Sequence, residues 1–400
     1  MEDGEPRLRG DIDEIMPGVI ADRRHLHMHP ELGFQEFETS RFVADRLTAI
    51  GVDDIKTGVG KTGVTALIRG TARNGNGKTL LIRADMDALP IDEENDVEYK
   101  SQNSGIMHAC GHDAHTAMLL AVARLLNERR DQFAGTVKLF FQPAEEGLGG
   151  AMAMIRDAAL EDPKPDNALG LHIWQHTDLG VVEARDSIAM VGGDGFTITV
   201  NGKGGHGAQP HLTIDPITVG AQIITALQTV VSREQSPIMP AVVTIGALHA
   251  GNASNVIPET AVMSGTIRSV TEEQRKMLAQ RVTEIAEGVG AAMRAQVDVA
   301  IKWGVPALVN DPELVKLVRS AASEVVGPEN AIEGELKVVS EDMAEVLNRV
   351  PGCFYFVGSR NAERGLIYGH HHARFDVDEA ALAIGIETMT RSALHYFAQE

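Results

Sequence analysis

The chain has 400 residues, of which 44% are hydrophobic, and 36 basic against 56 acidic residues give a formal net charge of -20. This length exceeds what one core usually organises, so we expect two domains. The acidic balance argues against a nucleic acid or an anionic membrane as a partner. No apolar run approaches the roughly 18 residues of a membrane span. A polar N-terminus and only two cysteines favour a reducing cytoplasm.

The first half of the chain predicts alternating strands and helices. Helices are expected at 12–27, 35–50, 116–126 and 151–157. Apolar strands are expected at 64–69, 79–84, 136–142 and 168–174. This order predicts an α/β fold, with a catalytic α/β/α domain around a central mixed sheet and polar groups at one edge of it.

From about residue 188 the pattern changes to strand, helix, strand, strand, helix, strand, which is typical of a ferredoxin-like unit. The strands are expected at 196–200, 241–249, 261–269 and 297–301, and the helices at 216–232 and 271–295. Afterwards we expect helices following Asp311-Pro312, at 341–349 and from 378, and a strand at 353–357. The catalytic domain is therefore predicted at 1–187 and 304–400, and an inserted α+β domain at 188–303.

The stretch Met107–His115 concentrates one thiol and three imidazoles in nine residues. Cys110 and His112 flank Gly111, where the backbone can bend sharply just before the predicted helix. Thiolate and neutral imidazole are ligands that Zn, Ni and Co favour. A packed free cysteine beside surface histidines is the alternative, and this stretch alone does not separate the two.

Acidic residues follow two predicted strands. Asp85 and Asp87 come after the strand at 79–84, and Glu145-Glu146 come after the strand at 136–142. Adjacent glutamates on a turn can face different directions, so one can bind a metal while the other handles a proton. The two aspartates are suited to orienting metal ligands.

Two further histidine positions can contribute donors. His172 lies in the predicted strand at 168–174, and the run His370–His372 lies near the C-terminus. Each could instead be a hydrogen-bonded core or surface residue. With Cys110, His112 and Glu146, they supply enough donors for a two-metal centre.

The inserted domain has its own candidate groups. His206 lies among glycines at 202–211, in a loop suited to close approach or simply to a tight turn. Asn255 and Arg268 are suited to clamping a substrate carboxylate, although Arg268 could merely form a surface ion pair.

Seven motifs together resemble the dinuclear metallo-amidohydrolases. This family includes hippurate hydrolase, indole-acetyl-amino-acid hydrolase, N-acetyl-diaminopimelate deacetylase, and related aminoacylases and carboxypeptidases. The similarity runs from about His27 to Asp378. In chain order the motifs are RADMDALP, MHACGHDAHTAML, FQPAEEG, GLHIW, GGHGAQPH, GNASNVIPE and HHARFDVDE.

The resemblance implies roles for individual residues. The implied metal ligands are Cys110, His112, Glu146, His172 and His371. His371 is chosen because it stands four residues before Phe375, as in the family's His-x-x-x-Phe pattern. Glu145 resembles the general base, and Asp87 the carboxylate that orients the site.

The inserted domain resembles the family's lid, which commonly mediates dimerisation. His206 resembles the lid histidine that reaches the active site of a neighbouring subunit, and Asn255 and Arg268 resemble groups that hold the substrate carboxylate. We therefore expect a homodimer or homotetramer formed through the lid. Many peptidase relatives carry His-x-Asp where this chain has Asp85-Met-Asp87. This difference groups the chain with the amidohydrolases rather than the aminopeptidases, and assigns no ligand role to Asp85.

The expected activity is hydrolysis of N-acyl amino acids, with acetyl, benzoyl or aryl-acetyl groups, by an enzyme holding two divalent ions. Zn, Mn, Co and Ni are the candidates. A carboxypeptidase or dipeptidase is the second hypothesis. A non-catalytic protein that binds metal or amino acids is the third, and Glu145 argues against it because binding needs no base beside the ligand Glu146.

Overall fold

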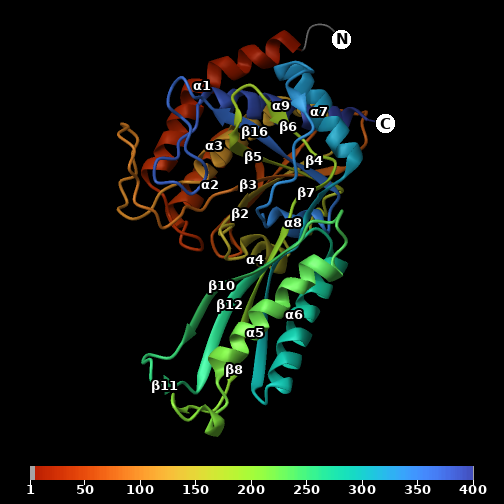
Figure 1. Cartoon of the computed structure of the whole chain (residues 1–400). Coiled ribbons are helices and arrows are strands. Elements are labelled where there is room, and N and C mark those ends of the chain that lie inside the picture. Colours follow the sequence, from red (N-terminus) through yellow and green to blue (C-terminus); the bar gives the residue numbers. More distant parts are fainter. Residues whose placement is uncertain (1–4, 400) are drawn as a thin grey trace. The chain divides into compact units, whose positions relative to one another are not determined.

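A computed structural model describes residues 5–399 and divides into two compact units, each considered by itself (Figure 1). The small unit comprises Met190–Leu308 and Leu336–Ala344, and the large unit comprises the remainder. The boundary expected at residue 303 falls inside strand β13 (Gln296–Val305), because that strand continues its pairing to Val305. Residues 336–344, assigned from sequence to the catalytic domain, group with the small unit.

The large unit is built on an eight-stranded sheet in the order β1-β2-β4-β3-β5-β16-β6-β15. Strands β4, β3, β5 and β16 run parallel to one another, whereas β1, β2 and β6 introduce antiparallel pairs. The prediction of a mixed central sheet is therefore confirmed. The strands are β1 (Asp53–Val59), β2 (Gly63–Arg69), β3 (Thr79–Asp85), β4 (Thr136–Gln142), β5 (Asn167–Asp178), β6 (Val182–Glu183), β15 (Ala331–Ile332) and β16 (Gly352–Arg360).

Helix α3 (His112–Asn127) is central to the large unit. It packs against α1 (Glu5–Met28), α2 (Phe37–Ile50), α9 (Ala380–Ala398) and β3. Only Arg124 of α3 is exposed, as expected for a helix that is apolar nearly all round. The helix begins at His112 rather than at 116 as predicted, because Gly111 adopts a left-handed conformation with φ 88° and caps it. His112 and His115 therefore both lie on the first turn.

The C-terminal part of the large unit differs in detail from the expectation. The helix expected at 341–349 is limited to α8 (Met343–Leu347). Strands β7 (Ser187–Met190) and β14 (Leu308–Asn310), which contain the boundaries between the units, pair with each other. The remaining elements are α4 (Gly150–Arg156), α7 (Pro312–Val326), and short helical turns at Arg130–Gln132, Pro210–Leu212 and Val230–Glu234. None of the helices within residues 5–399 has the length and apolar character that a membrane crossing requires.

The small unit has an antiparallel sheet in the order β10-β12-β8-β13, the strand order of a ferredoxin-like fold. Helices α5 (Pro216–Thr229) and α6 (Glu272–Ala292) pack on one face of it. A two-stranded ribbon of β9 (Gly205–His206) and β11 (Val256–Ile257) was not predicted, because two-residue strands carry no periodic signal. The main strands are β8 (Gly192–Asn201), β10 (Val242–Ala250), β12 (Thr260–Ser269) and β13.

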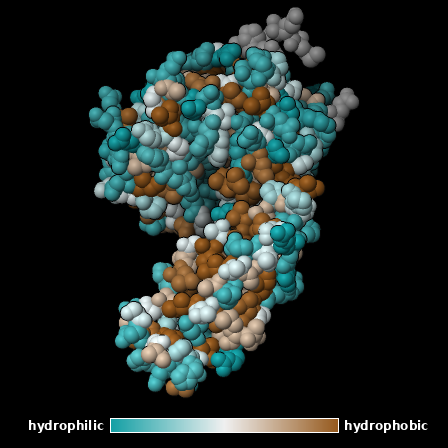
Figure 2. Space-filling view, viewed as in Figure 1, coloured by the Kyte–Doolittle hydropathy of each residue, from teal (hydrophilic) through white to brown (hydrophobic). Residues whose placement is uncertain are grey.

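The small unit carries exposed apolar surface (Figure 2). Val242 and Leu248 of the edge strand β10 and Ile217 of α5 are each about 40% exposed, at 38, 40 and 42%. Edge strands and exposed apolar surfaces of this kind commonly form protein contacts.

An ion pair with a buried carboxylate joins the first and last strands of the small unit to α6. Arg275 Nε and Nη2 donate to Asp194 Oδ2 and Oδ1 at 2.8 and 2.6 Å. The Gly304 N–H donates to Asp194 Oδ1 at 2.8 Å, and the Gly304 carbonyl accepts from Arg275 Nη2 at 2.8 Å. Asp194 therefore connects β8, β13 and α6.

Replacing Asp194 with alanine is expected to lower the free energy of unfolding by on the order of 2–3 kcal/mol, since Arg275 loses its partner in a partly buried site. Denaturant unfolding of the variant measures this loss. Glu284→Ala, which removes an exposed partner of Arg281, should leave the midpoint near that of the wild type. Equal midpoints for Asp194→Ala and Glu284→Ala would contradict the role of the Asp194 pair.

Candidate metal centre

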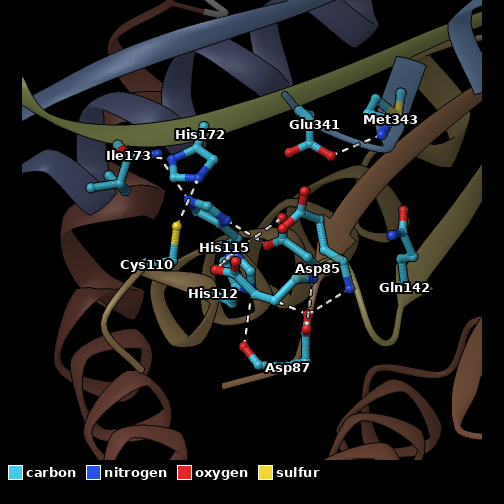
Figure 3. A network of polar contacts seen from close by, with 12 residues as sticks. Asp85, Asp87, Cys110, His112, His115, Gln142, His172, Ile173, Glu341 and Met343 are labelled. Carbon is cyan, nitrogen blue, oxygen red and sulfur yellow. Dashed lines mark hydrogen bonds and ion pairs between the residues drawn. The ribbon is translucent and has the colours of Figure 1, made fainter. Parts of the chain in front are cut away.

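The candidate centre lies at the carboxyl edge of adjacent parallel strands in the large unit. Strands β4 and β3 are neighbours and end at Gln142 and Asp85, next to the start of α3. Figure 3 shows side chains from these segments and from β5 turned toward one another. All five implied ligands and Glu145 fall into overlapping groups whose donor atoms lie within 4.8 Å of one another. The groups are Cys110, His112 and His172; Cys110, Glu146 and His371; and His112, Glu145 and Glu146.

The bend at Gly111 allows neighbouring side chains to enter the same site. Its φ of 88° is a conformation that residues other than glycine rarely adopt. On one side of the bend, Cys110 Sγ lies 3.5 Å from His172 Nε2. On the other side, His112 Nε2 lies 4.0 Å from Glu146 Oε1. The bend predicted from the sequence is therefore present.

Hydrogen bonds set the ring orientations of His112 and His172. His112 Nδ1 lies 2.9 Å from the Asp87 carbonyl and 3.3 Å from Asp87 Oδ1, so Nδ1 carries the proton of the neutral ring. His172 Nδ1 donates to the carbonyl of Ile173. In their neutral forms both rings present an unprotonated Nε2 to the site, and His112 Nε2 makes no hydrogen bond although it is buried. An imidazole held in this way is ready to bind a metal.

His115 lies one turn further along α3 but has a different environment. Its Nδ1 donates to Asp85 Oδ1 at 2.6 Å, and its Nε2 accepts the N–H of Ile173 at 2.8 Å. Because both ring nitrogens are used, His115 supports its neighbours rather than offering a ligand. Although burial alone would raise the pKa of Asp85, the Arg83 guanidinium and the rings of His112 and His115 hold it well below its usual range.

The structure distinguishes the three late histidines. His371 Nε2 lies 3.2 Å from Glu146 Oε1. His370 Nε2 instead accepts the N–H of Gln175 at 3.2 Å, and His372 Nδ1 accepts the N–H of Arg374 at 2.9 Å. Of the three, His371 therefore lies in the group that contains Glu146.

Asp87 connects helix α3 to the turn that carries the two glutamates. Its Oδ1 and Oδ2 accept the N–H groups of Glu145 and Glu146, each at 3.0 Å. Just before them, the buried Ala144 has a left-handed backbone with φ 54°, which costs roughly 1–2 kcal/mol in a residue other than glycine. A second buried carboxylate, Glu36, contacts this turn, and the sequence did not reveal it because one acidic residue in a polar loop forms no pattern.

The electrostatics of the site favour a divalent cation. Burial, together with Glu146 and Glu145, raises the pKa of the Cys110 thiol well above its usual range. Although burial alone would lower it, Asp85 and Asp87 raise the pKa of His112 to about 10. A dication would offset this excess of negative charge and compete with both protons. The mixed sulfur, nitrogen and oxygen donors suit Zn, Co or Ni.

The small unit separates the residues expected to bind substrate. His206 lies in β9 opposite Val256, and the carbonyl of the adjacent Asn255 accepts the N–H of Gly207 at 2.8 Å. Arg268 lies eight residues along β12 from Thr260, roughly 27 Å away at the usual rise of a strand. Asn255 and Arg268 are therefore not adjacent within one chain.

Residues 81–395 match peptidase family M20/M25/M40. The chain belongs to this family. Thermostable carboxypeptidase 2 of Saccharolobus solfataricus is 40% identical over 383 residues, which are 95% of each chain. N-acetyl-L-cysteine deacetylase of Bacillus subtilis is 40% identical over 368 residues, which are 91% of this chain and 84% of that protein.

A solved structure of another Bacillus subtilis protein, described as a dinuclear metal binding peptidase of family M20, has a TM-score of 0.83 and 32% identity. The match covers 96% of this chain and 99% of that one. The resemblance to metallo-amidohydrolases is thus confirmed, and the M20 chain is a hydrolase acting on amide bonds. The hypothesis of a non-catalytic binding protein is wrong.

Replacing His371 with alanine is expected to weaken the binding of one Zn²⁺ by at least about 100-fold, because Glu146 loses the donor beside it. Calorimetric titration of the metal-stripped protein with Zn²⁺ measures this change. His372→Ala is the matched control and should bind Zn²⁺ as the wild type does, since His372 contacts backbone instead. A loss of Zn²⁺ in the His372 variant but not in the His371 variant would reverse the assignment.

Proposed function

We propose that this M20 hydrolase cleaves the amide bond of N-acyl amino acids carrying an acetyl, benzoyl or aryl-acetyl group, releasing the amino acid and a carboxylic acid. The observation that carries the proposal is the position of Glu145, which lies in one donor group with His112 and Glu146, whereas Glu146 also lies in a second group with Cys110 and His371. A site that only bound metal would need no second carboxylate there. The 40% identity to an N-acetyl-L-cysteine deacetylase supports this substrate class.

Cys110, His112, Glu146, His172 and His371 would hold two divalent ions, with Zn, Mn, Co or Ni as candidates. The buried Nε2 of His112, which makes no hydrogen bond, and the mixed donor set support this assignment. When bound, such ions polarise the scissile carbonyl and acidify water.

Glu145 is the proposed general base. Its carboxylate takes a proton from the attacking water and later delivers that proton to the amine nitrogen as the C–N bond breaks. Asp87 supports this role by fixing the backbone of the turn through the N–H groups of Glu145 and Glu146. A base held in this way enters the reaction already oriented.

His206 is the proposed donor to the carbonyl oxygen as negative charge develops there. Its Nδ1 accepts the N–H of Ala208 at 3.0 Å, so in the neutral ring Nε2 carries the proton and can donate it in a hydrogen bond. Asn255 and Arg268 are proposed to hold the substrate carboxylate.

A homodimer or homotetramer formed through the small unit is part of the proposal. Arg268 lies roughly 27 Å along β12 from Thr260, which follows Asn255 by five residues, so a small substrate is not expected to contact Asn255 and Arg268 of the same chain. His206 is proposed to act on the active site of another copy in this assembly. The exposed apolar side chains of β10 and α5 support contact between copies.

A carboxypeptidase or dipeptidase is the second candidate, favoured by the 40% identity to thermostable carboxypeptidase 2. The chemistry would be the same, with an aminoacyl residue as the acyl group. Comparing dipeptides that have a free amino terminus with N-acetyl, N-benzoyl and indole-acetyl amino acids separates the two. Faster turnover of the dipeptides would overturn the first proposal.

Replacing Glu145 with glutamine is expected to lower kcat by about 10²–10⁴-fold with the bound metal retained, because the amide cannot accept the proton of water. Turnover of N-acetyl amino acids and metal content by mass spectrometry are measured together. Glu38→Gln, which changes an exposed glutamate paired with Arg41, is the control and should keep both values. A Glu145→Gln enzyme with near wild-type turnover would exclude Glu145 as the base.

Replacing Arg268 with alanine is expected to raise KM for N-acyl amino acids by about 10–100-fold, the value of a charge-assisted hydrogen bond to the carboxylate. The same substrates with the carboxylate converted to an amide provide the comparison. Wild type and variant should have similar KM for these amides. An equal rise in KM for the carboxylate substrates and for the amides would show that Arg268 does not recognise the carboxylate.

A further inference from the structure

A buried glutamate lies behind the turn that carries Glu145 and Glu146. Glu36 has no exposed surface, although it lies at the end of the polar loop that leads into α2. Its Oε1 accepts the N–H of Ala144 at 2.8 Å, and its Oε2 accepts the hydroxyl of Thr62 at 2.5 Å. Glu36 thus joins α2 and the start of β2 to the segment immediately before the proposed base.

Ala144 is held in a conformation that it would not adopt by itself. Its left-handed backbone, with φ 54°, is fully buried. The N–H of Ala144 donates to Glu36, and its carbonyl accepts the N–H of Gly150 at 3.0 Å. A Cβ on Gly33 would lie 3.1 Å from Ala144 Cα, so the loop before Glu36 packs directly on this residue. Strained backbone of this kind persists only where its surroundings hold it.

Two carboxylates together bind three consecutive backbone N–H groups. Glu36 accepts from Ala144, while Asp87 accepts from Glu145 and Glu146. Both acceptors are buried, and charge-assisted hydrogen bonds are about twice as strong as neutral ones. The orientation of the peptide groups at 144–146 sets the directions in which the two glutamate side chains leave the turn.

We propose that Glu36 is a positioning residue for the catalytic turn, which acts through the Ala144 N–H to orient Glu145 and Glu146. The inference rests on the proposed function in taking Glu145 as the base and Glu146 as a metal ligand. Glu36 contacts Ala144 and Thr62. Its effect on the reaction passes along the backbone from Ala144 to Glu145.

The hydrogen-bond geometry predicts which substitutions of Glu36 are tolerated. Glutamine keeps one oxygen to accept from Ala144, and its amide NH₂ can donate to the Thr62 oxygen after the hydroxyl rotates. Alanine leaves the Ala144 N–H without its acceptor. The function of Glu36 is therefore expected to survive in Glu36→Gln and to be lost in Glu36→Ala.

The chain offers a matched control in the same loop. Glu31 also accepts backbone N–H groups, from Glu38 and Thr39, and the hydroxyl of Thr39. These contacts fix the start of α2 and do not involve residues 144–146. Glu31→Ala therefore tests whether loss of any loop carboxylate affects the active site.

The experiment compares steady-state kinetics on an N-acetyl amino acid. Glu36→Ala is expected to lower kcat by about 10–100-fold with KM changed by less than about threefold, as loss of a supporting residue does. Glu36→Gln should recover most of the rate, and Glu31→Ala should match the wild type. If Glu31→Ala loses as much rate as Glu36→Ala, or if Glu36→Gln is as slow as Glu36→Ala, the inference is overturned.

A double-mutant cycle separates positioning from general damage. At saturating Zn²⁺, where the effect through Glu146 no longer limits the rate, adding Glu36→Ala to Glu145→Gln should reduce the residual rate by less than about threefold, because the remaining effect of Glu36 passes through Glu145. A further loss equal to that of the single Glu36→Ala variant would show an independent effect and contradict the proposal. If Glu36→Ala does not fold, Thr62→Val takes its place in the cycle, with a smaller expected loss of about 3–10-fold.

Zn²⁺ binding to the metal-stripped protein gives a readout independent of turnover. Glu36→Ala is expected to weaken the binding of one Zn²⁺ ion by about 10–100-fold, because Glu146 moves with the turn. Glu36→Gln should restore this affinity. If the wild type hydrolyses none of the substrates but this shift appears, the proposed function fails and the role of Glu36 stands. Unchanged Zn²⁺ affinity and unchanged kcat in Glu36→Ala would overturn the inference.

Discussion

Buried negative charge at the carboxyl edge of β3 is the constraint on which the centre depends. Asp85, Asp87 and the glutamate pair gather there with a thiol, and burying unpaired charge is costly. The two buried aspartates therefore have defined sets of partners. Asp85 is balanced by Arg83 and His115, whereas Asp87 is satisfied by backbone N–H groups and His112. What remains around Cys110, Glu146 and His371 is the excess charge that suits metal ions.

The partners of the carboxylates also account for the strained backbone nearby. Gly111 and Ala144 both have left-handed conformations, one before α3 and the other after β4. The first lets Cys110 and His112 enter one site, and the second precedes two adjacent glutamates with different surroundings. Strain of this kind is retained where hydrogen bonds over-determine the backbone, as Glu36 and Asp87 do at the glutamate turn.

A second buried network helps to bring the C-terminal histidines to a helix more than 250 residues earlier. Arg23 Nε lies 2.8 Å from Asp113 Oδ2, next to the proposed ligand His112, and Arg23 Nη2 donates to Asp376 Oδ1 at 2.8 Å. His27 Nδ1 donates to Asp113 Oδ2 at 2.8 Å. Helix α1, the start of α3 and the segment after His371 are thereby joined. The His371 N–H also donates to the carbonyl of Ala109 at 2.8 Å.

Local patterns in the sequence were sufficient to predict the mixed sheet of the large unit and the ferredoxin-like order of the small unit. They were also sufficient to identify the chemical types of the candidate donors. Hydrophobic periodicity and motif spacing are properties of neighbouring residues, so they can be read from the chain alone. The start of α3 was placed four residues late because the predicted apolar run does not include the polar turn His112–His115. The edge strand β1 was missed for a similar reason, since its side chains are mostly exposed and show no strand pattern.

Only the tertiary structure decided how individual donors are used. His115 has both ring nitrogens occupied, His370 accepts a backbone N–H, and His371 faces Glu146, although the three look alike in sequence. The separation of Asn255 from Arg268 along β12 likewise appears only in the folded small unit. The contact of Glu36 with Ala144 joins residues 108 positions apart. Such pairings depend on how distant segments pack, and no local pattern records them.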